Sequence, residues 1–249
     1  MHTEFISYMD GSVECEGYVA MASGLGRPTP VVLVCHAWAG QDDFARTQAE
    51  MLGRLGYIGF ALDVYGKGRR GGSTDENKKL MTPFVEDRAL LRGRLLAAVN
   101  TAHRLPMAHA NEIAAIGFCF GGLCALDIAR AGAPGVRGVV SFHGLFNAPP
   151  PAEVGPAQKM SARVLCLHGY ADPMVPPEAV TALASDLTEA GADWEIDMYG
   201  HTVHAFTNPL ANDPSFGTVY KQKVSDRAFA KMRLFLAELF EARMTAAAR

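Results

Sequence analysis

Short apolar runs alternate with longer amphipathic stretches through most of the chain. Residues 31–35 (VVLVC) form a continuous apolar run of strand length, as in strands that are buried on both faces of a parallel sheet. Phe84 to His103 places apolar residues, among them Leu91 and Leu95, at helical spacing, which predicts one long amphipathic helix. Such an alternation of strands and helices predicts an α/β fold with a mostly parallel central sheet and helices on both faces.

The other elements follow from the same pattern. Further predicted strands are Glu4–Tyr8, Val13–Met21, Tyr57–Asp63, Ile113–Ile116, Val136–Phe142, Arg163–His168 and Trp194–Tyr199. Further predicted helices are Phe44–Leu55, Leu123–Ala129, Pro177–Ala190 and Tyr220–Phe240. The first two of these strands flank the turn dipeptide Asp10-Gly11, so they predict an N-terminal antiparallel hairpin.

Two polar segments interrupt this pattern without dividing it. Residues 64–80 are rich in glycine and predict a loop or a short cap over the sheet edge. Residues 147–158 are rich in proline and predict a surface loop rather than a linker between domains. A length of 249 residues without internal repeats favours a single α/β domain over residues 1–249.

Composition narrows the classes of function. The net charge is −3 and no basic run exceeds two residues, which argues against a nucleic-acid partner or a membrane surface. The five cysteines include no C-x-x-C pair, which argues against a disulfide framework and a structural zinc site. The N-terminus lacks the pattern of a signal peptide and no apolar run reaches membrane-spanning length, so we expect a protein of the reducing cytoplasm. The sequence leaves the oligomeric state open.

Cys119 is the strongest candidate for chemistry. It lies in Gly117-Phe118-Cys119-Phe120-Gly121-Gly122, between an apolar run and a helix-like stretch. A strand, G-x-C-x-G and a helix form the nucleophile-elbow pattern, with cysteine at the position where serine is usual. The turn places the sulfur at a helix N-terminus, where partial positive charge favours the thiolate. The structural alternative is a buried cysteine beside a tight glycine turn.

A carboxylate and a histidine follow later strands in the order that an elbow nucleophile requires. Asp172 follows the strand that ends at His168, although an aspartate before proline is also common in turns. His201 and His204 both follow the next strand, and the pattern alone does not choose between them. The order nucleophile, acid, histidine is that of the α/β hydrolases. Imidazole would take the thiol proton, and the carboxylate would fix its tautomer.

An elbow of this kind also implies an oxyanion hole made of backbone N–H groups. One donor should be Phe120, directly after the nucleophile, and the other should come from the loop after residues 31–35, where we assign Ala37. No residue pattern calls for a cofactor or a metal ion.

These blocks resemble the dienelactone hydrolase family. The blocks that carry the resemblance are Gly-Phe-Cys-Phe-Gly-Gly, Leu-His-Gly-Tyr-Ala-Asp-Pro-Met-Val-Pro and Val-His-Ala-Phe. The resemblance covers residues from about 1 to 240 and implies an α/β-hydrolase fold. It also implies a cofactor-free hydrolase of small esters or lactones with Cys119, Asp172 and His204 as its triad. It selects His204 over His201, because the family's histidine precedes a small residue and a phenylalanine.

The chain departs from the family's type at two positions. His36 stands where the type has a glutamate, and Asn208 stands where it has an arginine, which argues against a dicarboxylate-like dienelactone as substrate. His36 is either a proton carrier, a hydrogen-bond donor or a structural residue of its loop. Arg69, Arg70 and Arg88 are candidates for anion binding, and a surface charge is the alternative for Arg88. As substrate-binding residues we assign His36, Trp38, Arg88 and Phe206.

Two alternatives to the ester hydrolase remain. A thiol amidotransferase also uses a cysteine elbow, but it usually has a carboxylate two residues after the histidine, where this chain has Phe206. A non-catalytic binding module of the same fold would have a thiol of ordinary pKa, near ~8.5, and no fast alkylation of Cys119.

Overall fold

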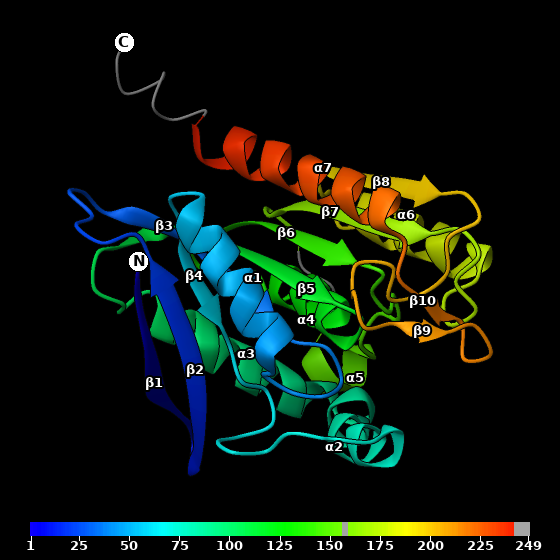
Figure 1. Cartoon of the computed structure of the whole chain (residues 1–249), viewed down its shortest axis with the longest axis horizontal. Coiled ribbons are helices and arrows are strands. Elements are labelled where there is room, and N and C mark those ends of the chain that lie inside the picture. Colours follow the sequence, from blue (N-terminus) through cyan, green and yellow to red (C-terminus); the bar gives the residue numbers. More distant parts are fainter. Residues whose placement is uncertain (156–158, 242–249) are drawn as a thin grey trace.

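In the computed structural model, which describes residues 1–155 and 159–241, the main sheet has eight strands in the order β1-β2-β4-β3-β5-β6-β7-β8 (Figure 1). The strands β3 to β8 run parallel to their neighbours, and the N-terminal hairpin β1–β2 joins β4 in the antiparallel direction. The strand bounds are β1 His2–Asp10, β2 Val13–Met21, β3 Thr29–Cys35, β4 Ile58–Ala61, β5 Ala108–Phe118, β6 Val136–Phe142, β7 Arg163–Gly169 and β8 Trp194–Tyr199. The predicted parallel sheet and its hairpin are therefore present.

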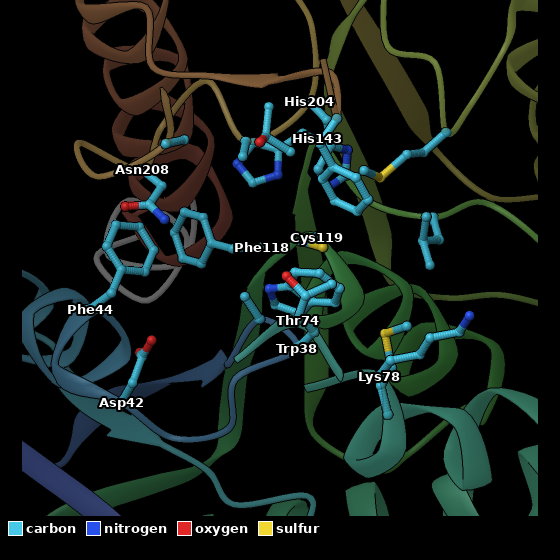
Figure 2. Close-up of a pocket in the computed structure, with 18 of the residues that line it drawn as sticks. Trp38, Asp42, Phe44, Thr74, Lys78, Phe118, Cys119, His143, His204 and Asn208 are labelled. Atoms are coloured by element: carbon cyan, nitrogen blue, oxygen red, sulfur yellow. The ribbon is translucent and has the colours of Figure 1, made fainter. Parts of the chain in front are cut away.

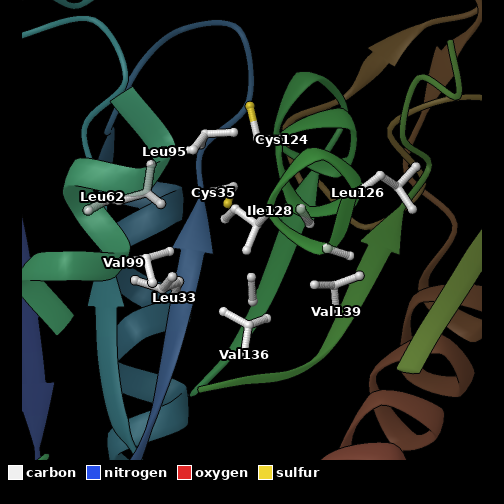
Figure 3. Packing of buried hydrophobic residues seen from close by; sticks show 14 of the residues in the cluster. Leu33, Cys35, Leu62, Leu95, Val99, Cys124, Leu126, Ile128, Val136 and Val139 are labelled. Carbon is white, nitrogen blue, oxygen red and sulfur yellow. The ribbon is translucent and has the colours of Figure 1, made fainter. Parts of the chain in front are cut away.

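Helices cover both faces of the sheet because successive strand residues point to opposite sides. In β3, Val32 and Val34 pack in the core under α1 (Asp43–Arg54) and α7 (Gln222–Glu241). Leu33 and Cys35 pack in the other core, under α3 (Arg88–Ala102), α4 (Phe120–Arg130) and α6 (Pro177–Glu189). Figure 3 shows this second core, in which Leu33 and Cys35 lie among Leu95, Val99 and Ile128.

The parallel direction of the strands determines where polar side chains meet. The strands β3, β5, β7 and β8 all end at the same edge of the sheet, so the loops that follow them are neighbours in space. These loops contain the residues that the sequence analysis assigned to the catalytic triad and the oxyanion hole.

The prediction of one helix from Phe84 to His103 was wrong. The structure has two helices there, α2 (Thr74–Glu86) and α3, separated by Asp87 in an extended conformation. The Asp87 carboxylate accepts a 2.8 Å hydrogen bond from the N–H of Leu90, so Asp87 caps α3 and ends the preceding helix. The segment 64–80 is accordingly a loop up to Ser73 followed by the first turns of α2.

The sequence pattern did not predict three short elements. These are α5 (Pro151–Val154) and a hairpin made of β9 (Asn212–Asp213) and β10 (Thr218–Val219). α5 lies within the predicted loop 147–158, of which residues 156–158 are outside the described part of the chain. Residues 242–249 of the predicted single domain are also outside it.

Candidate active site

Cys119 occupies a strained turn between β5 and α4. Its backbone has φ +57° and ψ −118°, a region that residues with a side chain rarely adopt. Two glycines make the turn possible: a Cβ on Gly117 would lie 1.8 Å from the Gly121 carbonyl oxygen, and a Cβ on Gly121 would lie 2.0 Å from that of Cys35. The strand therefore passes directly into the helix, and the thiol is partly exposed while the other four cysteines are buried.

Asp172 and His204 form a buried pair beside this turn. His204 Nδ1 lies 2.7 Å from Asp172 Oδ2, and the other carboxylate oxygen accepts from the N–H of Met174 at 2.9 Å. Asp172 is only 3% exposed and His204 only 1%. With both carboxylate oxygens bonded, the imidazole is fixed with a proton on Nδ1 and with Nε2 free to accept one.

The other ring nitrogen of His204, Nε2, is not bonded to Asp172. It is buried and makes no well-formed hydrogen bond with any described residue. Burial alone would lower the pKa of His204, but the charge of the Cys119 thiolate and the hydrogen bond to Asp172 outweigh it and raise the pKa to about 10. Cys119 and His204 also line the same cavity, as Figure 2 shows.

Two backbone N–H groups are available next to the thiol. Phe120 is the first residue of α4, so its N–H has no partner within the helix. Ala37 lines the cavity, and no carbonyl of the described residues accepts its N–H. The Ala37 carbonyl is itself held by Gly40 N–H at 3.2 Å and His36 Nδ1 at 2.7 Å. The loop after β3 is thus kept in a defined conformation.

The structure places His36 in this loop but not in the cavity. Its Nε2 accepts from the N–H of Val64 at 3.1 Å, so Nδ1 carries the proton that is donated to Ala37. Burial lowers the pKa of His36, which keeps the ring neutral. Among the alternatives left by the sequence, these contacts favour a structural residue of the loop.

The other assigned substrate residues are divided between cavity and core. Trp38 lines the cavity, which has a volume of about 480 Å³, a usual size for a small-molecule site. Phe206 is fully buried and packs its ring against His143 and Tyr199, with centroids 5.1 and 5.6 Å apart. Phe206 therefore packs in the core next to the loop that contains His204 and does not line the cavity.

Arg88 lies away from the cavity, in the interface of α3 and α4. Its guanidinium donates to both carboxylate oxygens of Asp127 at 2.6–2.9 Å and to the carbonyl of Asn147 at 3.0 Å. It is 3% exposed, which corrects the alternative interpretation of a surface charge. Arg69 and Arg70 bond to carbonyls of Tyr65 and Gln41 and do not line the cavity either.

Substitution of Arg88 by methionine is expected to lower the free energy of unfolding by about 3 kcal/mol, because among the described residues it leaves the buried Asp127 carboxylate with only Arg130 as partner. Urea unfolding measures the change. Arg104→Met, at an exposed position, is the control and should change stability by less than about 0.5 kcal/mol. The double variant Arg88→Met with Asp127→Asn should recover part of the loss; no loss in the single variant would show that the ion pair contributes nothing.

Several cavity residues were missed by the sequence analysis. His143 follows β6 and lines the cavity with its ring 5.1 Å from that of His204. Burial and the neighbouring His204 hold the pKa of His143 well below its usual range, so it adds no positive charge. Its position at a strand end is the signal that could have identified it. Lys78 and Phe216 lie in segments without such a signal.

The described residues offer no site for a metal ion and no membrane-spanning helix. No group of three histidine, cysteine, aspartate or glutamate side chains in residues 1–155 and 159–241 is arranged to bind a metal. Over the same ranges, every helix is too short or too polar to cross a bilayer.

Comparison with known proteins identifies the family of the chain. The model of the dienelactone hydrolase family matches residues 15–240. The chain belongs to the dienelactone hydrolase family. Its fold is accordingly the α/β-hydrolase fold, and it is a carboxylic ester hydrolase of the dienelactone hydrolase type.

Individual relatives of this dienelactone hydrolase-like chain are distant. A protein of Caenorhabditis elegans, "Uncharacterized protein K02A2.1", is 33% identical over 60% of this chain and 94% of its own. A "Putative carboxymethylenebutenolidase" of Yersinia pestis is 28% identical over 78% of this chain and 74% of its own. The solved structure of the "Dienelactone Hydrolase-like Promiscuous Phospotriesterase P91 from Metagenomic Libraries" has a TM-score of 0.89 and 30% identity, and covers 96% of this chain and 98% of its own.

Proposed function

We propose that this dienelactone hydrolase-like protein cleaves small esters or lactones through a thioester on Cys119, with His204 and Asp172 as the other members of its triad. The observation that carries the proposal is the buried His204–Asp172 pair of 2.7 Å, whose histidine lines the same cavity as Cys119 in its strained elbow. A fixed imidazole with one free nitrogen beside an elbow thiol is the arrangement that nucleophilic catalysis requires. A free thiol of this kind is compatible with a reducing cytoplasm.

The steps follow from the charges of the site. The Cys119 thiolate attacks the carbonyl carbon, and the N–H groups of Phe120 and Ala37 donate to the oxygen that becomes negative. The tetrahedral intermediate collapses, the bond to the leaving oxygen breaks, and the His204 imidazolium gives that oxygen a proton. The product of this half-reaction is a thioester and a free alcohol or enol. Neutral His204 then takes a proton from water as the water attacks the thioester carbon. The carbon–sulfur bond breaks, the acid product is released, and the Cys119 thiolate and the His204 imidazolium are restored.

The thiol chemistry favours particular leaving groups. Thiolate departs from a tetrahedral intermediate more easily than alkoxide, so the first intermediate tends to revert unless the substrate's own leaving group is stabilised. Activated esters and enol-lactones meet this requirement, whereas peptides do not.

The charges of the cavity favour a neutral substrate. Among the described lining residues, Lys78 is the only lysine or arginine, and it is accompanied by Asp42 and Asp75. Asn208 also lines the cavity at the position where the family's type has an arginine. Neither Arg88 nor the other arginines considered from the sequence reach it. A dicarboxylate would therefore meet more negative than positive charge.

This charge argument predicts that kcat/KM for phenyl acetate exceeds that for phenyl hydrogen succinate, which carries a carboxylate on the acyl chain, by about tenfold or more at low salt. Spectrophotometric release of phenol measures both. Asp42→Asn combined with Asp75→Asn should narrow the difference, and Asp193→Asn, at an exposed site, should leave it unchanged. A clear preference for the anionic ester would contradict the proposed neutral substrate.

Alkylation of Cys119 by iodoacetamide tests the proposed triad without any assumption about substrate. The raised pKa of His204 keeps the imidazolium charged, and that charge stabilises the thiolate, so alkylation should remain fast well below pH ~8.5. His204→Asn removes that charge, so alkylation at pH 6–7 should be slower than in the wild type. Peptide mass spectrometry follows Cys119 apart from the buried cysteines. An ordinary thiol profile in the wild type would instead favour the non-catalytic binding module.

A further inference from the structure

Two aromatic rings from distant parts of the chain meet at the cavity. Trp38 directly follows the proposed oxyanion donor Ala37, and Phe216 lies at the tip of the β9–β10 hairpin. Their ring centroids are 5.7 Å apart with an interplanar angle of 19°, so the rings are stacked. Both residues line the cavity, and Figure 2 shows Trp38 on the Cys119 side of it. Phe216 is still 43% exposed, which leaves apolar ring surface available.

The tip of the hairpin is fixed by its own hydrogen bonds. Asp213 Oδ1 accepts from the Ser215 hydroxyl at 2.6 Å and from the Phe216 N–H at 3.0 Å. Gly217 adopts φ +77°, and a Cβ there would lie 2.3 Å from Cγ of Pro173, the residue after Asp172. These contacts define the direction in which Phe216 projects.

β10 and the glycine before it are hydrogen-bonded to the backbone of the proposed catalytic histidine. The His204 N–H donates to the Gly217 carbonyl at 3.0 Å, and the Val219 N–H donates to the His204 carbonyl at 3.1 Å. A swing of the hairpin would therefore displace His204 and break two backbone hydrogen bonds. The geometry is that of a fixed wall and not of a lid.

We propose that Trp38 and Phe216 form an aromatic wall that makes the site select substrates with a planar acyl or leaving group. Aromatic faces stack favourably on flat conjugated groups, whereas a puckered ring of the same size makes poorer contact. A third ring does not fit between the two, because it would need about 7 Å between their planes, so the substrate stacks on the face that the pair presents to the cavity. This inference rests on the proposed function where it is tested with ester substrates. The binding test described below does not depend on hydrolysis.

Matched esters test the wall in turnover. p-Nitrophenyl benzoate and p-nitrophenyl cyclohexanecarboxylate differ in the planarity of the acyl ring, and phenyl acetate and cyclohexyl acetate differ in that of the leaving group. Phe216→Leu keeps an apolar side chain but removes the aromatic face, and should lower the planar-to-puckered ratio of kcat/KM about 3- to 10-fold in at least one pair. Phe216→Tyr should retain the ratio, and so should Leu210→Ala, an 89% exposed neighbour outside the cavity.

A second variant keeps both aromatic side chains but removes the hydrogen bonds that orient Phe216. Asp213→Ala deletes the acceptor that orients the tip, so the same ratio should fall in the direction seen for Phe216→Leu. Ratios unchanged in both ester pairs for both variants would overturn the proposal.

Binding separates this proposal from the proposed hydrolysis. Isothermal titration of benzamide and cyclohexanecarboxamide to the full-length Cys119→Ala protein needs no turnover. Benzamide should bind more tightly, and the preference should fall about 3- to 10-fold when Phe216→Leu is added. Equal affinities with and without Phe216→Leu, or no measurable binding of either amide, would overturn the wall. A lost preference in a chain that hydrolyses none of the esters would support the wall and contradict the proposed function.

Discussion

Substitution of Cys119 by alanine is expected to lower kcat for p-nitrophenyl acetate by more than about 10⁴-fold, because Cys119 is the only cysteine among the described residues that line the cavity. Alanine keeps the backbone of the elbow, so the Phe120 and Ala37 N–H groups and the His204–Asp172 pair should stay in place. Continuous release of nitrophenolate measures the loss, and urea unfolding shows that the variant is folded.

Cys124→Ala is the matched control for this experiment. Cys124 lies on the same helix, α4, but is fully buried, and burial raises the pKa of its thiol well above the usual value. Its removal should leave kcat within a few-fold of the wild type. Equal losses in both variants would point to a folding defect, and an active Cys119→Ala protein would refute the nucleophile assignment.

Substitution of Asp172 by asparagine is expected to lower kcat by about 10⁴-fold, the order of loss seen when a triad carboxylate is made neutral. Asparagine has the same shape but lacks the negative charge that helps to raise the pKa of His204. The imidazolium would then lose its proton at lower pH, and the Cys119 thiolate would lose its counter-charge. Steady-state kinetics gives the fall in kcat, and iodoacetamide alkylation at pH 6–7 should slow in parallel.

Two controls distinguish a loss of catalysis from a loss of structure in Asp172→Asn. Asp172 also accepts a hydrogen bond from Met174, so a folding control by urea is needed. Asp193→Asn, whose carboxylate is exposed in a pair with Arg163, should change kcat and the alkylation rate little. Activity of Asp172→Asn within about threefold of the wild type would remove Asp172 from the proposed triad.

The positions of the strand ends, and the residues that meet there, could be predicted from the sequence. Continuous apolar runs located β3, β5, β6 and β7, and the parallel direction of these strands brings the residues after them to one edge. Cys119 and Asp172 follow β5 and β7, and His204 follows β8, which is parallel to β7. The rule would also have identified His143, had it been applied to every strand.

The burial of single polar side chains, and their contacts with residues far away in the sequence, could not be predicted in the same way. Arg88 looks like a surface charge within its own helix, and only the packing of α3 on α4 brings Asp127 to it. His36 looks like a proton carrier until Val64, from the loop after β4, supplies a donor to its ring. The hairpin β9–β10 has two-residue strands without an apolar pattern, so the meeting of Phe216 with Trp38 depends on tertiary contacts.

The central claim is that a thioester forms on Cys119, and rapid acid quench followed by mass spectrometry tests it directly. Protein mixed with p-nitrophenyl acetate and quenched during the burst should gain the mass of one acetyl group, and the modified peptide should contain Cys119. Quenched wild-type protein that turns over the ester without an acyl group on Cys119, or with one on another residue, would contradict the account.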